Sequence, residues 1–492
     1  MEPVPRIVAV LATAAVLTAG CRAAGPGGGA GPTISATPAF SQFDPPLHPT
    51  LASAGDPYTP GDGNGGYHVE HYGLNLRITP GDNVRELDAT AALTSVATGD
   101  LTSFDLDLTG LTVASVQVNG ATAAYTRQGE KLTVTPARPL AKGVRFSTSV
   151  TYHGTPQAIH EPTLGTYGWI RTRDGIFTAD QPSGAHTWFP CNDHPSDKAS
   201  YDFTVTVPSG LQVVANGEPV TGLGGGVHSA SPTAGNSTIT SHWREAEPMA
   251  TYLATVDVGH FQIKTGRTPG GIPIIVAVDP TVAGVGLDDL YARTAEITDA
   301  WVKLFGPYPF DSTGVIYDNA PVNFALETQT RPVFGDYPLD PTILAHELTH
   351  EWFGDSVSVT KWQDIWLNEG FATYFEWTWG ERLGGKSVQQ QYDERYGLVG
   401  DPRWRIEPGN PGKDKMFDGF AVYDRAAMTL QALRTRVGDD KFFAIVRAWA
   451  AERRGGNGTT PEFVATAERI SGMQLGPLFQ AWLYGTTRPT NW

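Results

Sequence analysis

The chain has 492 residues, more than one hydrophobic core usually supports, so we expect two or three domains. Its formal net charge of −16 at pH 7 argues against a surface that binds nucleic acid and favours solubility. The composition is ordinary for a globular protein and does not define the fold.

The N-terminus has the pattern of an export signal. Residues 1–20 are predicted to be a signal peptide, because their apolar run, residues 7–19, is too short to span a bilayer. The run ends in TAGC, which resembles a bacterial lipobox, so we expect a lipid on Cys21 that holds the protein at the outer face of the cell membrane. Residues 21–61 begin with a Gly- and Pro-rich stretch and are predicted to form a flexible tether. The alternative is a plain secretory signal and a secreted protein.

Residues 62–260 show the pattern of a β-rich domain. From about Tyr67, short runs such as HYGLNLRI, ELDATAAL and VRFSTSVTYHG alternate apolar and polar residues, and Gly, Pro and Asp separate them. A period of two is typical of strands with one buried face. The stretch GLGGGVHSASPTAGNS, residues 222–237, interrupts this pattern and is predicted to be a loop.

Residues 261–492 are predicted to form a mixed α+β domain, because the pattern shifts towards helix after about Ile275. Helices are predicted at residues 289–306, 339–354, 364–385 and 418–440. In the second of these, Asp340 stands in the N-cap position, Pro341 in the first helical position, and Gly354 marks the end.

The second predicted helix carries the motif HELTH, with His346 and His350 four residues apart. Residues at this spacing share one face of a helix, so both imidazoles can reach a common metal ion. Glu347 can then reach a water at the metal without being a ligand itself. The alternative is two solvated histidines with an unrelated acid between them.

A third ligand is needed for a catalytic zinc site, which uses three protein ligands and keeps one position open. Glu369 follows His350 after 18 residues and lies near the start of the third predicted helix. That helix can fold back beside the second one and deliver a carboxylate. We therefore predict one Zn²⁺ per chain, bound by His346, His350 and Glu369.

The block HELTHEWFGDSVSVTKWQDIWLNEGFATYFE resembles the core of the M1 metallopeptidases, the aminopeptidase N and leukotriene A4 hydrolase group of gluzincins. Weaker likenesses lie upstream, in QPSGAHTWFPCNDHPSDKASYDF, VVANGEP and PMATYLATVDVG, in the order of the family's β domain. The resemblance implies a multidomain fold, with saddle-like antiparallel sheets before a thermolysin-like α+β catalytic domain. It also implies a zinc-dependent aminopeptidase that acts on peptides with a free N-terminus.

The resemblance assigns the remaining roles. Glu347 would be the general base, and Tyr423 matches the family tyrosine that donates a hydrogen bond to the oxyanion, although the sequence after it differs from the family's Tyr-Glu-Lys-Gly. Glu327 matches the glutamate of the family's Gly-x-Met-Glu-Asn strand, which binds the substrate's α-amino group, and Gln181 matches a second amine contact. Phe324 and Thr328 replace the Gly and Asn of that strand, so the shape of the first side-chain pocket stays open.

Four other residues near these motifs are predicted to have no part in catalysis. Cys191 and Asp193 are expected to be structural, and Glu351 and Asp355 are expected to be solvated charges. If Cys21 is acylated, Cys191 has no partner for an intrachain disulfide.

Three functions remain open at this point. The first is a zinc aminopeptidase, and the second is a zinc endopeptidase, which the altered residues around Glu327 allow. The third is a non-catalytic binding or scaffold protein that keeps the M1 fold, although a scaffold would need none of the predicted ligands. An assay of peptides with free and with acetylated N-termini separates the three.

Overall fold

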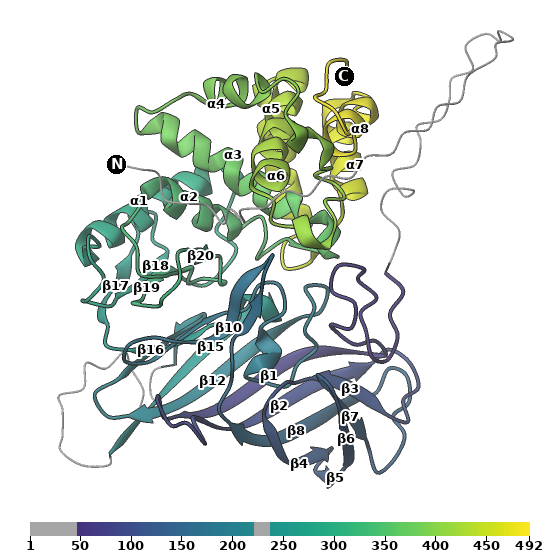
Figure 1. The fold of residues 1–492 in the computed structure, drawn as a ribbon, viewed down its shortest axis with the longest axis vertical. Coiled ribbons are helices and arrows are strands. Elements are labelled where there is room, and N and C mark those ends of the chain that lie inside the picture. Colours follow the sequence, from purple (N-terminus) through teal and green to yellow (C-terminus); the bar gives the residue numbers. More distant parts are fainter. Residues whose placement is uncertain (1–46, 221–236) are drawn as a thin grey trace, which may run out of the picture.

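The computed structural model describes residues 47–220 and 237–492 (Figure 1). The predicted signal peptide, the proposed lipid site Cys21, most of the predicted tether and nearly all of the predicted loop at 222–237 lie outside the described residues. In the part of the chain that is described, no helix combines the length and the apolarity needed to cross a bilayer.

An eight-stranded sheet dominates the first half of the chain. Its strands, in spatial order, are β14 (Glu218–Pro219), β15 (Thr238–Ala250), β12 (Lys198–Pro208), β1 (Tyr67–Ile78), β2 (Leu87–Ala97), β8 (Arg145–Gly154), β4 (Thr112–Val118) and β5 (Ala121–Thr122). The expected antiparallel pairing holds throughout except between β1 and β12, which run parallel. Alternate side chains of β2 are fully buried, as the period of two predicts.

Two smaller sheets complete this half. One contains β3 (Phe104–Asp107), β7 (Lys131–Thr135) and β6 (Ala124–Gln128). The other contains β13 (Gln212–Ala215), β16 (Val256–Gly259), β11 (Ile176–Ala179), β10 (Gly165–Arg171) and β9 (Ile159–Glu161). Short 3₁₀ turns lie at η2 (Ala185–Thr187) and η3 (Thr251–Leu253). A buried aromatic cluster lies inside, where Tyr72 stacks on Tyr201 at 4.9 Å between ring centroids.

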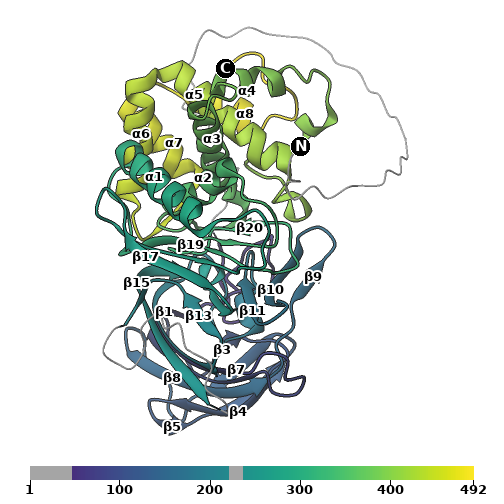
Figure 2. The same ribbon diagram turned by 90° about the vertical axis from the view of Figure 1, so that its left-hand side faces the viewer.

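The second half begins with a five-stranded sheet that lies between the β-rich half and the helices (Figure 2). Its strands are β17 (Gln262–Arg267), β18 (Pro273–Val278), β19 (Thr313–Tyr317), β21 (Val333–Phe334) and β20 (Ala325–Leu326). The helices are α1 (Leu287–Phe305), α2 (Pro341–His350), α3 (Trp366–Arg382), α4 (Val388–Tyr396), α5 (Ala426–Val437), α6 (Asp439–Glu452), α7 (Thr460–Ser471) and α8 (Gly476–Leu483). Shorter pieces are η4 (Trp362–Asp364), η5 (Pro402–Arg405), η6 (Lys413–Lys415), the π-helix η7 (Gly419–Arg425) and the strand pair β22 (Ser358–Val359) and β23 (Asn457–Gly458).

This order of elements, a sheet-rich half followed by a helical half, confirms the predicted fold class. The division between residues 260 and 261 stays a prediction, although β17 is the first strand of the new sheet.

The predicted N-cap of α2 is confirmed, because Asp340 accepts a hydrogen bond from the backbone N–H of Thr342. The predicted end at Gly354 is wrong: the helix ends at His350, and the N–H groups of Trp352 and Phe353 turn back to the carbonyl of Thr349.

The prediction that the tether extends to residue 61 is wrong from residue 47 onwards. Asp56 is buried and accepts hydrogen bonds from the backbone N–H groups of Tyr58 and Trp362, and it also contacts His194. The hydroxyl of Tyr58 donates to Asn410 at 2.7 Å. The prediction relied on composition, which does not show that this short segment is fixed by specific hydrogen bonds to both halves of the chain. We refer to residues 54–59 as the N-terminal clip.

We predict that Asp56→Ala lowers the free energy of unfolding by roughly 2–4 kcal/mol, since buried N–H groups lose their acceptor. Burial raises the pKa of Asp56, but its contact with His194 and its backbone hydrogen bonds outweigh burial and hold that pKa below the usual 3.8. The stabilisation is therefore complete above the unfolded-state pKa and is lost as the pH falls through the lower, folded-state value.

Urea unfolding from pH 7 to about pH 3 measures this effect. The difference between the wild type and Asp56→Ala should shrink as the pH falls below 3.8, whereas the exposed Asp311→Ala should follow the wild type throughout. Equal stability of Asp56→Ala and wild type at pH 7 would contradict the prediction.

Candidate metal centre

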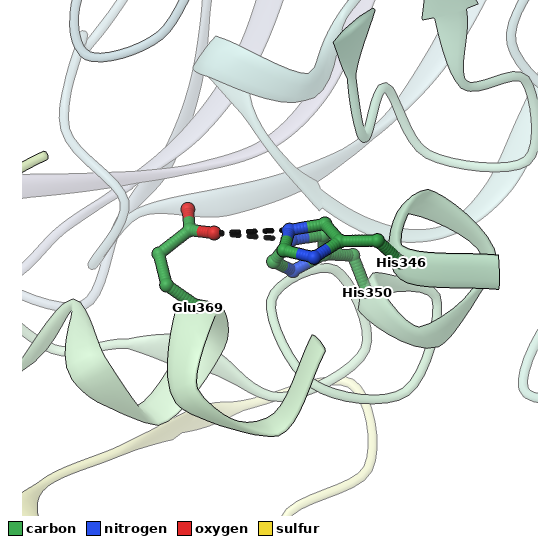
Figure 3. A group of neighbouring side chains, drawn as sticks. All are labelled: His346, His350 and Glu369. Carbon is green, nitrogen blue, oxygen red and sulfur yellow. Dashed lines mark hydrogen bonds and ion pairs between the residues drawn. The ribbon is translucent and has the colours of Figure 1, made fainter. Parts of the chain in front are cut away.

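Two helices bring the predicted metal ligands together. His346 and His350 lie one turn apart on α2, and Glu369 lies in the first turn of α3 (Figure 3). Oε2 of Glu369 is 3.3 Å from Nε2 of His346 and 3.4 Å from Nε2 of His350. All three side chains are buried, and one ligand atom from each lies within 4.8 Å of the others.

These separations suit a tetrahedral metal ion. Ligands at about 2.0–2.1 Å from a tetrahedral Zn²⁺ lie about 3.3–3.4 Å from one another. Two imidazole nitrogens and one carboxylate oxygen are also a donor set that zinc accepts in catalytic sites. The three residues therefore fit the predicted ion.

The second nitrogen of each histidine is held by a neighbour. Nδ1 of His350 lies 3.0 Å from the carbonyl oxygen of Phe353, and Nδ1 of His346 lies 3.2 Å from Oε2 of Glu376. Both contacts favour a proton on Nδ1 and leave the lone pair of Nε2 for a metal. Sequence reasoning missed Glu376, although its position seven residues after Glu369 places it on the same face of α3.

The electrostatics of the centre reflect burial and mutual pairing. Burial opposes the charged imidazolium of His346, but hydrogen bonds to Glu369 and Glu376 outweigh it and raise its pKa to about 10. Burial raises the pKa of Glu347 to about 7, against the opposite effect of His346 and His350. The pKa of Glu347 therefore reflects a balance between burial and the nearby histidines.

Glu347 projects into the same cavity as the ligands. Residues that line this cavity include Gln181, Phe324, Glu327, Tyr337, His346, Glu347, His350, Glu369, Glu376 and Tyr423. Glu327, Glu347 and His350 also form a compact group, with one polar atom of each within 4.8 Å of the others. Glu327 and Glu347 therefore both lie close to the ligand His350.

The two predicted amine contacts meet each other. Nε2 of Gln181 donates a hydrogen bond to Oε1 of Glu327 at 2.8 Å, although 146 positions separate the two residues. Glu327 follows β20 directly and is buried, and burial raises its pKa while His350 opposes the rise. Thr328 turns away, because its hydroxyl donates to the carbonyl of Arg331, so of the two altered residues only Phe324 lines the cavity.

Tyr423 lies on the π-helix η7, which continues into α5. Its ring lies nearly parallel to that of His346, with 6.0 Å between centroids and 17° between planes. A π-helix is wider than an α-helix and often occurs at functional sites. The sequence predicts a helix here but not this form of it.

Glu351 and Asp355 are fully buried, so the prediction of solvated charges is wrong. Oε2 of Glu351 accepts a hydrogen bond from the N–H of Thr330. The chain after α2 packs against the β-rich half, where Nζ of the buried Lys198 donates to the carbonyls of Asp355, Ser356 and Gly456. Charge alone therefore did not indicate exposure.

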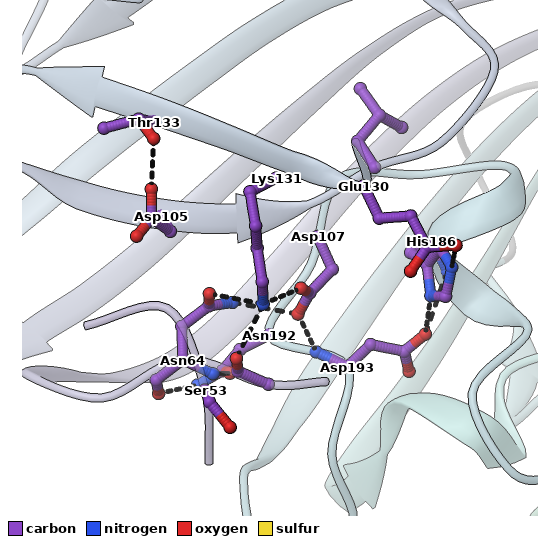
Figure 4. A network of polar contacts seen from close by, with 12 residues as sticks. Ser53, Asn64, Asp105, Asp107, Glu130, Lys131, Thr133, His186, Asn192 and Asp193 are labelled. Atoms are coloured by element: carbon purple, nitrogen blue, oxygen red, sulfur yellow. Dashed lines mark hydrogen bonds and ion pairs between the residues drawn. The ribbon is translucent and has the colours of Figure 1, made fainter. Parts of the chain in front are cut away.

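Cys191 and Asp193 are buried in the β-rich half, as a structural role requires. Asp193 pairs with His186 and accepts a hydrogen bond from the hydroxyl of Thr251. Figure 4 shows this pair beside Lys131, which bonds to Asp107 and Asn64. The network fixes the turn that leads from Gln181 into β12.

Two family models match the chain. The model of the peptidase M1 N-terminal domain matches residues 68–253, and that of the peptidase family M1 domain matches residues 338–482. Aminopeptidase M1 of Arabidopsis thaliana is 27% identical over 332 residues, which are 62% of this chain and 36% of that protein. Aminopeptidase N of Lactobacillus helveticus is 24% identical over 451 residues, which are 85% of this chain and 51% of that protein.

Solved structures agree with the family models. The M1 zinc metallopeptidase from Deinococcus radiodurans has a TM-score of 0.79 and 28% identity, covering 90% of this chain and 99% of that one. A mutant of the same enzyme bound to a Tyr-Ser-Ala substrate has a TM-score of 0.80 and 27% identity, with the same coverage. The chain therefore belongs to peptidase family M1, and it spans about a third to a half of the length of the two curated relatives above.

We predict that Glu376→Gln weakens zinc binding by about 10- to 100-fold, because the charged acceptor at Nδ1 of His346 is lost. Competition with a chromogenic zinc chelator measures this affinity. Glu381→Gln on the same helix is the matched control and should bind zinc as the wild type does. Unchanged affinity in Glu376→Gln would show that its carboxylate does not support the ligand.

Proposed function

We propose that this member of peptidase family M1 is a zinc-dependent aminopeptidase, which hydrolyses the N-terminal peptide bond of peptides. One observation carries the proposal: the half-buried Gln181 and the buried Glu327, which are hydrogen-bonded to each other, face the same cavity as His346, His350 and Glu369. A metal centre explains hydrolysis, and a carboxylate beside it explains selection of a free N-terminus.

The amine contact follows from charge. A free α-amino group has a pKa of about 7.7–8.0 and is largely cationic at pH 7. The ionised carboxylate of Glu327 would bind it in a buried place where charge-assisted hydrogen bonds are strong. Gln181 orients that carboxylate through Oε1 and leaves Oε2 for the substrate.

The chain's own residues supply the proton transfers. Zinc, when bound, supplies Lewis-acid chemistry that makes water nucleophilic near neutral pH. Glu347 takes the proton of the attacking water and delivers it to the nitrogen of the leaving amine. Tyr423, beside His346, donates its hydroxyl proton to a hydrogen bond with the oxyanion.

The cell location is also proposed. Export, and the lipid on Cys21 that would hold the protein at the outer face of the bacterial membrane, rest on the sequence of residues 1–21 alone. Peptides outside the cytoplasm would then be the substrates. Mass spectrometry of the mature N-terminus tests this part separately.

The proposed specificity is tested with pairs of fluorogenic peptides that differ only in an acetyl group on the N-terminus. We expect cleavage of the free peptides alone. Glu327→Gln should lower kcat/KM on them by about 10- to 150-fold, which corresponds to the loss of one charge-assisted hydrogen bond. Gln181→Ala should lower kcat/KM by a smaller factor, and the exposed Glu394→Gln should leave kcat/KM unchanged.

Cleavage of the acetylated peptides alone would favour the endopeptidase, and absence of both zinc and turnover would favour the scaffold. Either result would overturn the proposal.

Glu347→Gln separates metal binding from catalysis. We expect kcat to fall by about 10²- to 10⁴-fold, because the amide of Gln cannot take the proton from water, while one zinc per chain remains bound. Steady-state kinetics and elemental analysis of the same preparation measure the two quantities. Activity close to that of the wild type would remove Glu347 from the proposed mechanism.

A further inference from the structure

A second group of acids lies away from the metal centre, among loops that follow several strands. Asp174 lies in the turn between β10 and β11, Asp279 follows β18 directly, and Asp318 follows β19 directly. Figure 2 shows β10 and β11 below the sheet that contains β19. The group therefore joins the β-rich half to the second half.

The three carboxylates converge. Each offers one oxygen, and these oxygens lie within 4.8 Å of one another. Asp279 and Asp318 are buried, whereas the side chain of Asp174 is 24% exposed. Solvent therefore reaches the group from the Asp174 side.

Hydrogen bonds satisfy only part of this group. Nδ2 of Asn319 donates to Asp279 and to Asp174, and the N–H of Asn319 donates to Oδ1 of Asp318. Oδ2 of Asp318 has no partner among the described residues, although the side chain is fully buried. Oδ2 of the neighbouring Asp257 is likewise buried and unpartnered within the described ranges.

Positive charge at the group is sparse. Nδ1 of His260 lies 2.5 Å from Asp174, but the side chain is 59% exposed, and among the residues that the structure describes it pairs with this acid alone. Burial raises the pKa of Asp318 well above its usual value, and the carboxylates of Asp257, Asp279 and Asp174 raise it further. A buried carboxylate oxygen without a partner costs free energy unless a proton or a metal ion neutralises it.

We propose that Asp174, Asp279 and Asp318 bind one divalent cation, and that this cation is calcium. The donors are all carboxylate oxygens. Hard cations such as Ca²⁺ favour sites made of oxygen alone, whereas zinc favours sites that include nitrogen or sulfur. Each Ca–O distance is about 2.3–2.6 Å, so two oxygens on one Ca²⁺ lie at most about 4.6–5.2 Å apart. The three carboxylate oxygens, all within 4.8 Å of one another, meet this condition. The open side at Asp174 admits the water molecules that complete its coordination.

The cation would fasten two segments that lead to the amine contact. Asp174 precedes Gln181 through β11, and Asp318 precedes Glu327 through β20. If the cation fixes the distance between Asp174 and Asp318, it also limits the movement of Gln181 relative to Glu327. The calcium site itself does not depend on the proposed peptidase activity, and only this positioning role rests on it.

The test uses the full, zinc-loaded protein after dialysis against calcium-free buffer. Adding CaCl₂ should raise the unfolding midpoint by a few degrees in a saturable way, and elemental analysis should find one calcium per chain beside one zinc. MgCl₂ and NaCl at matched ionic strength should raise it much less. Asp318→Asn should abolish the calcium response, and Asp174→Asn should shift it to at least tenfold higher calcium.

The control variant is Asp202→Asn, a surface acid that pairs with Arg244, and it should keep the wild-type response. The proposal is overturned if about 10 mM CaCl₂ leaves the midpoint unchanged, if Mg²⁺ or Na⁺ act equally, or if Asp318→Asn still responds. Unfolding needs no substrate, so a protein that binds calcium but cleaves no peptide would contradict only the proposed function.

Discussion

The packing of α2 against α3 is the contact on which the metal centre depends. It places one oxygen of Glu369 at nearly equal distances from Nε2 of His346 and of His350. A buried aromatic layer supports this contact from beside it: Phe353, in the turn after α2, stacks on Phe371 of α3 at 4.4 Å, and Phe305 of α1 meets Phe375 of α3 at 4.4 Å. Ring contacts of this kind resist sliding, so the spacing of the three ligands is set by the hydrophobic core.

The parts of the site that the sequence predicts are those where chain spacing and helix geometry act together. His346 and His350 share a face because they are four residues apart, and Glu369 meets them because a short connection returns the chain. Glu327, Gln181 and Tyr423 could be identified only through resemblance to a family, since nothing local marks them. The structure brings all of them to one cavity, while their roles stay proposals.

The remaining features depend on tertiary contacts that no local pattern records. Glu376 shares a face of α3 with Glu369, but only the packing of α3 against α2 shows that its carboxylate meets Nδ1 of His346. Glu351 and Asp355 look like surface charges, yet the chain after α2 turns into the junction with the β-rich half, where Lys198 crosses to meet it. The end of α2, the π-helix at Tyr423 and the parallel pairing of β1 with β12 were missed for the same reason.

The N-terminal clip also determines which hydrogen bonds oppose a force that pulls on the N-terminal end of the chain. Asp56 bonds to the backbone of Trp362, and Tyr58 bonds to Asn410, so a pull on the chain upstream of residue 47 is opposed by hydrogen bonds to the helical half before it reaches β1. His194 anchors the same residue to the sheet-rich half. Tension from an attachment point would therefore be shared between both halves, and the sheet would not unravel from its first strand.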